Sequence, residues 1–120
     1  MRPHRRLDVW NKSIDFVINV YEMTKSFPKS EEFILTGQLR RAVVSITSNI
    51  AEGAGRQTKK EFIQFLHMAQ GSASEVDTQL EIAYRLGYLT DAEKSNLENN
   101  LENISKMITG LQKSLKNSIR

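Results

Sequence analysis

The sequence predicts an all-α protein, an antiparallel up-down-up-down four-helix bundle that forms a single domain over residues 1–120. Three observations lead there. Apolar residues recur every three or four positions, no segment shows the alternation typical of a strand, and both prolines and most glycines fall between the periodic stretches. Short connections favour antiparallel neighbours. The expected helices span about residues 7–26, 31–53, 59–86 and 91–117.

The first expected helix, residues 7–26, carries two apolar rows. One row consists of Trp10, Ile14, Val17 and Tyr21, and the other of Phe16, Val20, Met23 and Phe27. Two rows indicate contacts with neighbours on two sides. The helix should stop before Pro28, because proline disfavours helical geometry in the residue that precedes it.

The second expected helix, residues 31–53, should start after Ser30 as its N-cap. We expect Gly53 and Gly55 to end it, since glycine accepts the left-handed backbone of a helix C-terminus. Beside the apolar row lies a row of polar side chains, the polar stripe, which contains Arg41, Ser45, Ser48, Asn49 and Glu52. The polar stripe either contacts a neighbouring helix or subunit or faces solvent, and the sequence leaves both open.

Capping boxes open the third and fourth expected helices. Thr58 with Glu61 and Thr90 with Glu93 show the spacing in which each side chain satisfies a free backbone N–H of the other residue. Gly87 is the expected C′ residue of the third helix, with Tyr88 folding back. Small side chains near Gly71 and Ser72 should let another helix approach. The fourth helix has a heptad seam of Leu97, Leu101, Ile104, Ile108, Leu111 and Leu115.

The sequence offers no set of residues for catalysis, a metal or a cofactor. It has no cysteine, and of its two histidines, His4 lies in the start of the chain and His67 has only Ile63 and Gly71 one helical turn away. No histidine shares a helix face with Ser45 or Ser48, so a nucleophile lacks its base. The glycines before Lys59 do not have the order of a phosphate-binding loop. We therefore expect no enzyme, and the lack of a long apolar run favours a cytoplasmic protein without a membrane partner.

The charge is unevenly distributed. Residues 1–60 carry 11 basic and 6 acidic side chains, whereas residues 61–120 carry 6 and 8. Such an excess suits an anionic partner, although it also fits an ordinary solvated surface. The candidates for binding RNA or DNA are Arg2, Arg5 and Arg6 at the start and Arg56, Lys59 and Lys60 near the positive N-terminus of the third helix.

Three segments resemble a known family. Residues 7–31 read LDVWNKSIDFVINVYEMTKSFPKSE, residues 35–56 read LTGQLRRAVVSITSNIAEGAGR and residues 61–89 read EFIQFLHMAQGSASEVDTQLEIAYRLGYL. In order and in their SNIAEG and GSASE stretches they resemble the bacterial four-helix bundle proteins, also described as 23S rRNA intervening-sequence proteins.

The resemblance implies a homo-oligomer, in family members a ring-like pentamer. It also implies a link to accessory proteins that bind nucleic acid and a reverse transcriptase. The positions that match the family's signatures are Arg40, Arg41, Ser48, Asn49, Glu52 and Gly53 in the second helix and Gly71, Ser72 and Glu75 in the third. Our leading hypothesis is a non-enzymatic oligomeric bundle that binds RNA, DNA or a nucleoprotein partner. The alternative is a homo-oligomeric scaffold without nucleic acid.

Overall fold

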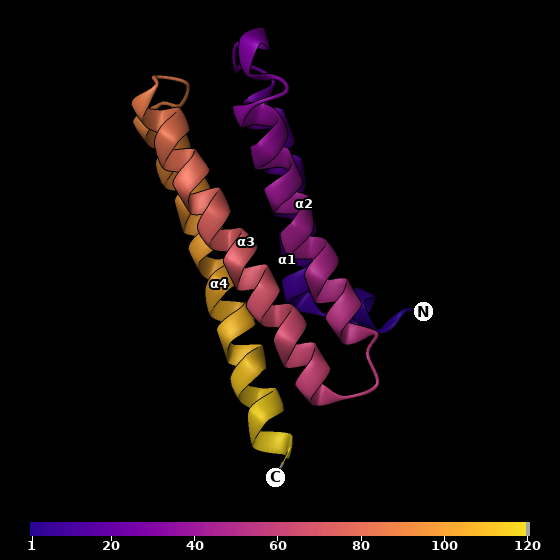
Figure 1. Ribbon diagram of the computed structural model, residues 1–120. Coiled ribbons are helices and arrows are strands. Elements are labelled where there is room, and N and C mark those ends of the chain that lie inside the picture. Colours follow the sequence, from indigo (N-terminus) through magenta and orange to yellow (C-terminus); the bar gives the residue numbers. More distant parts are fainter. Residues whose placement is uncertain (120) are drawn as a thin grey trace.

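The computed structural model describes residues 1–119 as four long helices with two short 3-10 turns. Consecutive helices run in opposite directions (Figure 1), and α1 also contacts α4, which closes the bundle. The molecule measures 49 × 22 × 20 Å. The elements are η1 (Pro3–Arg6), α1 (Asp8–Thr24), η2 (Lys29–Glu31), α2 (Leu35–Ala54), α3 (Lys59–Arg85) and α4 (Asp91–Ile119).

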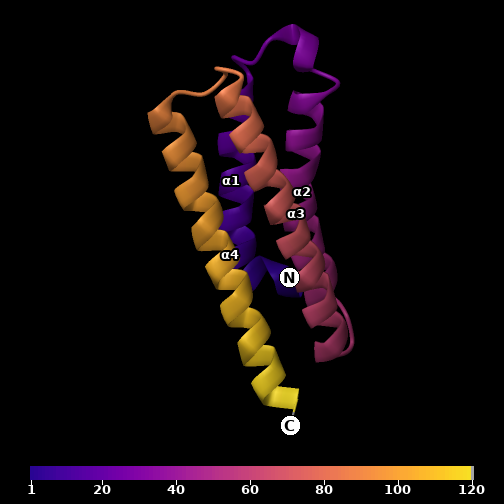
Figure 2. The same cartoon turned by 60° about the vertical axis from the view of Figure 1, so that its left-hand side comes forward.

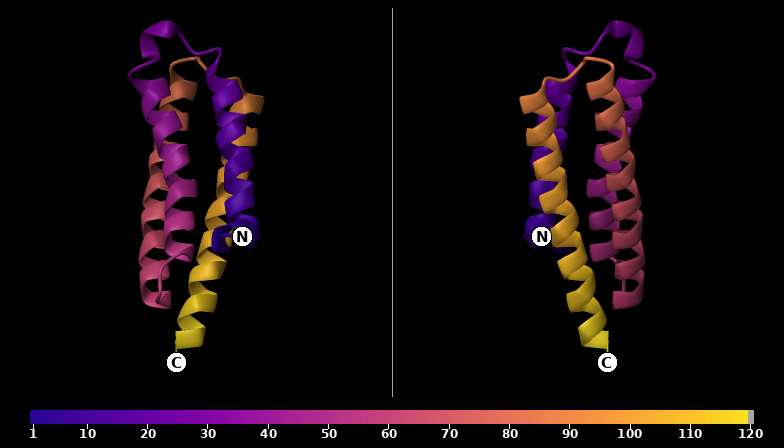
Figure 3. Two further views of the ribbon diagram at one scale, coloured as in Figure 1. Left: turned by 90° about the vertical axis from the view of Figure 1, so that its right-hand side faces the viewer. Right: turned by 90° about the vertical axis from the view of Figure 1, so that its left-hand side faces the viewer.

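The topology gathers three separate parts of the chain at one end of the bundle. The start of the chain, the connection from α2 to α3 and the end of α4 lie there, as Figure 2 shows. The other two connections lie at the opposite end. Figure 3 shows α4 running past the start of α1 and beyond the level at which α3 begins.

The core of α1 confirms only part of the expected rows, since Phe16 and Val20 of the second row are buried. The buried residues are Val9, Ser13, Phe16, Val20 and Thr24, whereas Tyr21 of the expected first row is exposed. The two buried hydroxyls are satisfied: Thr47 Oγ1 donates to Ser13 Oγ (3.0 Å) and Thr24 Oγ1 donates to the Val20 carbonyl (2.8 Å). Hydrogen bonding lets serine and threonine fill core positions that an apolar pattern does not identify.

In α4 the expected seam is confirmed over Leu97, Leu101, Ile104 and Ile108, which are buried. Leu111 and Leu115 are only partly buried against the core. The last turns of α4 therefore have fewer neighbours than the rest of the seam.

The prediction that α2 starts after Ser30 is wrong, because α2 begins at Leu35 and Ser30 lies in η2. Tertiary contacts hold this connection in another shape. The Tyr88 hydroxyl donates to Glu31 Oε2 (2.9 Å), and the rings of Tyr88 and Phe27 lie 5.4 Å apart. These contacts fasten the connection to the end of α3.

We expected Gly53 and Gly55 to end α2 through a left-handed backbone, and the structure does not show this. Gly55 caps the helix at φ −87°, and Gly53 lies inside it. A Cβ at Gly53 would lie 2.8 Å from both Phe62 Cδ1 and Phe65 Cβ, so Gly53 allows α3 to pack closely. Gly87, with φ +83°, is the C′ residue as predicted.

The other helix-end predictions are confirmed, except that the capping box of α3 forms only the half in which Thr58 accepts from Glu61 N. Tyr88 N donates to the Ala83 carbonyl (2.9 Å), which is the Schellman ending of α3. Thr90 and Glu93 form the full reciprocal capping box of α4, with distances of 2.8 and 3.1 Å. At the start of α3, Glu61 N donates to Thr58 Oγ1 (3.1 Å), and the hydroxyl of Thr58 in turn donates to the Glu61 carboxylate (2.9 Å).

Candidate nucleic-acid interface

The end of the bundle formed by residues 1–8, 52–61 and 113–119 is called the basic end below. These segments carry eight basic and three acidic side chains. The acidic residues are Asp8, Glu52 and Glu61. The basic residues, all of them exposed, are Arg2, Arg5, Arg6, Arg56, Lys59, Lys60, Lys113 and Lys116. All six candidates for binding nucleic acid thus lie at one end.

The turn η1 brings the first arginines onto the end of α2. Arg2 and His4 line a hollow of about 500 Å³ together with Ser48, Gly55 and Arg56. The arginines before α1 therefore share a surface with the connection between α2 and α3.

Two arginines of the basic end lie on aromatic rings. The Arg5 guanidinium carbon is 5.4 Å from the centre of the Trp10 ring, and His4 packs on the same ring at 4.7 Å. The Arg56 guanidinium carbon is 4.7 Å from the centre of the Phe65 ring, while its Nη2 pairs with Glu52 at 3.4 Å. Cation–π contact limits how far each guanidinium can move.

Lysines connect α3 with the end of α4. Lys59 Nζ lies 3.5 Å from the Ser118 carbonyl. Lys60 and Lys116 line a groove of about 400 Å³ together with Glu61, Ile63 and Ile119. Sequence reasoning missed Lys113 and Lys116, because it counted them with the acidic second half of the chain. Counting charge by the ends of an antiparallel bundle would have found them.

The opposite end, residues 22–34 and 81–98, carries four basic and seven acidic side chains. Here the charges pair with one another. Glu81 accepts from Arg85 Nε at 2.7 Å and lies 3.3 Å from Lys94 Nζ. The hydrogen bond from Arg85, and then that from Lys94, lowers the pKa of Glu81 below its usual value. Glu31 raises the pKa of Tyr88 by accepting its hydroxyl hydrogen bond.

The structure brings part of the polar stripe into contact with α3. Ser45 Oγ and Ser72 Oγ lie 2.9 Å apart, and Asn49 Nδ2 donates to the Ser45 carbonyl (2.9 Å) and hydroxyl (3.1 Å). The expectation of polar contact between these helices is therefore met by Ser45 and Ser72, while Asn49 bonds within α2.

The remaining candidates for helix or subunit contact lie on the surface of the chain. These are Arg41, Ser48, Glu52, Gly71 and Glu75. A Cβ at Gly71 would meet no atom within 4 Å, so the close approach expected there is made at Gly53. For the exposed members, a role in subunit contact stays a prediction.

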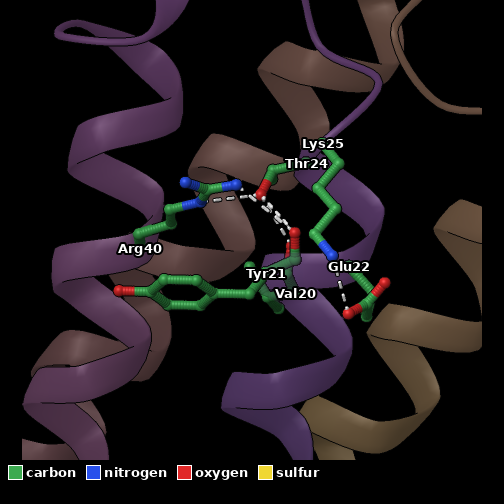
Figure 4. Close-up of polar contacts among 6 residues, drawn as sticks. All are labelled: Val20, Tyr21, Glu22, Thr24, Lys25 and Arg40. Atoms are coloured by element: carbon green, nitrogen blue, oxygen red, sulfur yellow. Dashed lines mark hydrogen bonds and ion pairs between the residues drawn. The ribbon is translucent and has the colours of Figure 1, made fainter.

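Arg40 joins α2 to α1. Its Nε donates to Thr24 Oγ1 (2.9 Å), its Nη2 donates to the Tyr21 carbonyl (3.3 Å), and the guanidinium lies 4.6 Å from the centre of the Tyr21 ring. Figure 4 shows these contacts beside the exposed pair of Lys25 with Glu22. Arg40 therefore acts within the chain, as a structural residue.

Residues 1–119 contain no cluster of three or more histidine, aspartate or glutamate side chains that could hold a metal ion. None of the helices in this range is long and apolar enough to cross a membrane.

Comparison with known proteins places the chain. No curated protein matches it significantly. A solved structure, described as a protein of unknown function from the S23 ribosomal protein family of Bacteroides thetaiotaomicron, is similar with a TM-score of 0.81 and 27% identity. The match covers 88% of this chain and 95% of that one. The family model of the 23S rRNA-intervening sequence proteins matches residues 5–110. The chain belongs to the 23S rRNA-intervening sequence protein family.

Proposed function

We propose that this protein is a non-enzymatic helical bundle that binds nucleic acid through its basic end. The single observation that carries the proposal is the convergence of eight basic side chains from three separate segments on one end of the bundle. Lysine and arginine side chains bind phosphate and release condensed counterions, which drives association without a catalytic site.

Two further observations support a role in binding. Among the ion pairs between described residues, Arg56 with Glu52 is the one at the basic end, and four lie at the opposite end. Apart from Arg56, the described cations at the basic end thus form no ion pair that would compete with phosphate. The family takes its name from 23S rRNA and the similar structure from a ribosomal protein family, and both names refer to settings rich in phosphate.

The test is a titration of a fluorescent structured RNA and of duplex DNA with the protein, followed by anisotropy at several salt concentrations. The affinity should fall steeply with salt, with a slope of about −0.9 in log–log form for each phosphate contact. The variant Lys59→Gln/Lys60→Gln should bind more weakly and have a shallower slope. The matched control Lys25→Gln/Lys29→Gln loses the same charge at the opposite end and should bind normally. Absence of binding at low salt would overturn the proposal.

A homo-oligomeric scaffold, a pentamer by family resemblance, is the second candidate. It is favoured by exposed apolar side chains on α1, α2 and α3, namely Ile18 (59% exposed), Val44 (40%), Met68 (54%) and Ile82 (44%). Exposed apolar side chains on helix surfaces suit contact with another subunit.

Light scattering tests the scaffold directly. We expect a mass of several chains for the wild type and a lower mass for Val44→Asp or Met68→Asp. The matched control Ser74→Asp adds the same charge at an exposed position of α3 outside this apolar group. A monomeric wild type would eliminate the scaffold. A reverse transcriptase or other protein partner would be sought by co-purification only after this result.

A further inference from the structure

We propose that the basic end takes duplex nucleic acid, through phosphates of both strands, in preference to unstructured single strands. This inference rests on the proposed function and names the form of its ligand. Two observations carry it: other side chains cover the aromatic rings near the basic end, and basic side chains are dense there.

Proteins that bind single strands offer aromatic rings on which bases stack. Among the phenylalanine, tyrosine and tryptophan side chains of residues 1–119, Tyr21 and Phe33 are exposed. Neither of them belongs to the basic end. At the basic end, Trp10 is in contact with His4 and Arg5, and Phe65 lies beneath Arg56. Phe62 packs against Gly53 inside the bundle. A base would have to displace one of these partners before it could stack.

The same contacts prepare the arginines for phosphate. A guanidinium that lies on a ring directs its N–H groups outward from the edge of its plane, where phosphate oxygens can accept hydrogen bonds. Arg5 and Arg56 are restrained in this way before any ligand arrives. Less side-chain freedom is then lost on binding.

The density of charge favours two strands over one. The bundle is 22 × 20 Å in cross-section and presents eight basic side chains at this end. Over about 20 Å a duplex presents roughly 12 phosphate charges, whereas one strand presents roughly 6. After the three carboxylates are subtracted, the basic end has an excess of five positive charges, and a surface that binds through phosphates alone meets more of them on a duplex.

The chain contains one tryptophan, Trp10, so intrinsic fluorescence reports directly on the ring nearest the basic side chains. The probes are a 20-base-pair RNA duplex, the matching DNA duplex, and 20-nucleotide oligouridylate and oligoadenylate. Each is titrated with the full chain at about 0.1 M salt, where one additional phosphate contact is worth about tenfold in affinity. Lys29→Gln serves as the control for a general effect of net charge.

We expect both duplexes to bind at least about tenfold more tightly than either single strand, the difference of one or more phosphate contacts. The emission of Trp10 should stay unchanged in the duplex complexes, because no base stacks on the ring. Single strands that bind as tightly as the duplexes, or that quench Trp10 at saturation, would overturn this inference and leave the proposed function standing. Failure of all four probes to bind would overturn both.

Discussion

The two ends of the bundle handle charge in different ways. At the opposite end, cations pair with carboxylates within and between helices, as Arg85 of α3 and Lys94 of α4 do with Glu81. At the basic end, arginines are held by aromatic rings, and Glu52 provides the one ion pair found there among described residues. The opposite end is left with an excess of three acidic side chains, and the basic end with an excess of five basic ones. The net charge of +3 therefore describes neither end.

The largest expected effect comes from removing the excess charge. The variant Arg6→Gln/Lys60→Gln/Lys116→Gln takes one cation from each segment of the basic end. Each lost phosphate contact should cost about tenfold in affinity at 0.1 M salt, so the triple variant should lose up to about a thousandfold. Anisotropy with a fluorescent RNA duplex measures the change.

The control for that experiment removes the same number of charges from the opposite end, in Lys25→Gln/Lys29→Gln/Arg85→Gln. Its affinity should stay close to that of the wild type. Equal losses in the two triple variants would mean that the overall charge, and not the basic end, attracts the nucleic acid.

The next effect concerns the packing that supports the basic end. In Gly53→Ala the new methyl group would lie 2.8 Å from Phe62 and Phe65, and such overpacking costs about 1–3 kcal/mol of unfolding free energy. Gly71→Ala is the matched variant, because a Cβ there meets no atom within 4 Å. It should raise stability by about 0.5–1 kcal/mol through helix propensity. Urea denaturation measures both, and a Gly53→Ala variant as stable as the wild type would contradict the packing role.

These two glycines illustrate what the sequence could and could not predict. The number of helices, the capping boxes and the ending at Gly87 follow from local patterns, because caps and turns depend on a few neighbouring residues. Which glycine permits a close helix approach depends on the rotation of two helices about their axes. Local pattern placed that role near Gly71, and the structure places it at Gly53.

The candidate site shows the same division. The sequence identified six basic residues, since clusters of charge are visible along the chain. It missed Lys113 and Lys116, because they are distant in sequence and meet the other cations only after α4 has returned to the start of α3. It also missed the pairing of Arg5 with Trp10 and of Arg56 with Phe65, which depends on side-chain orientation.

A smaller effect is the difference in stability lost when the glutamate of each capping box is replaced by alanine. Glu93 accepts a hydrogen bond from Thr90 N at the opposite end, so Glu93→Ala should lower the unfolding free energy by about 0.5–1.5 kcal/mol. Glu61 accepts only from the Thr58 hydroxyl, and Glu61→Ala should destabilise less. Because it also removes an acidic group from the basic end, Glu61→Ala should tighten duplex binding at low salt. Weaker binding by this variant would count against the basic end as the interface.

The smallest expected effect is a pH dependence confined to the opposite end. The hydrogen bond to Glu31 raises the pKa of Tyr88 above its usual 10.0. The stabilisation from this contact is therefore complete below that value and is lost as the pH rises through the pKa of the folded state. Between about pH 9 and 12 the melting temperature should fall more steeply with rising pH for the wild type than for Tyr88→Phe. Identical slopes in the two proteins would show that the contact does not stabilise the fold.

The most direct test of the central claim compares lysines at the two ends within one sample. The protein is acetylated briefly with and without a saturating RNA duplex, and mass spectrometry gives the extent of modification at each lysine. The account predicts that the duplex protects Lys59, Lys60 and Lys116 at the basic end and leaves Lys25 and Lys29 as reactive as before. Equal protection at both ends, or protection confined to Lys25 and Lys29, would contradict it.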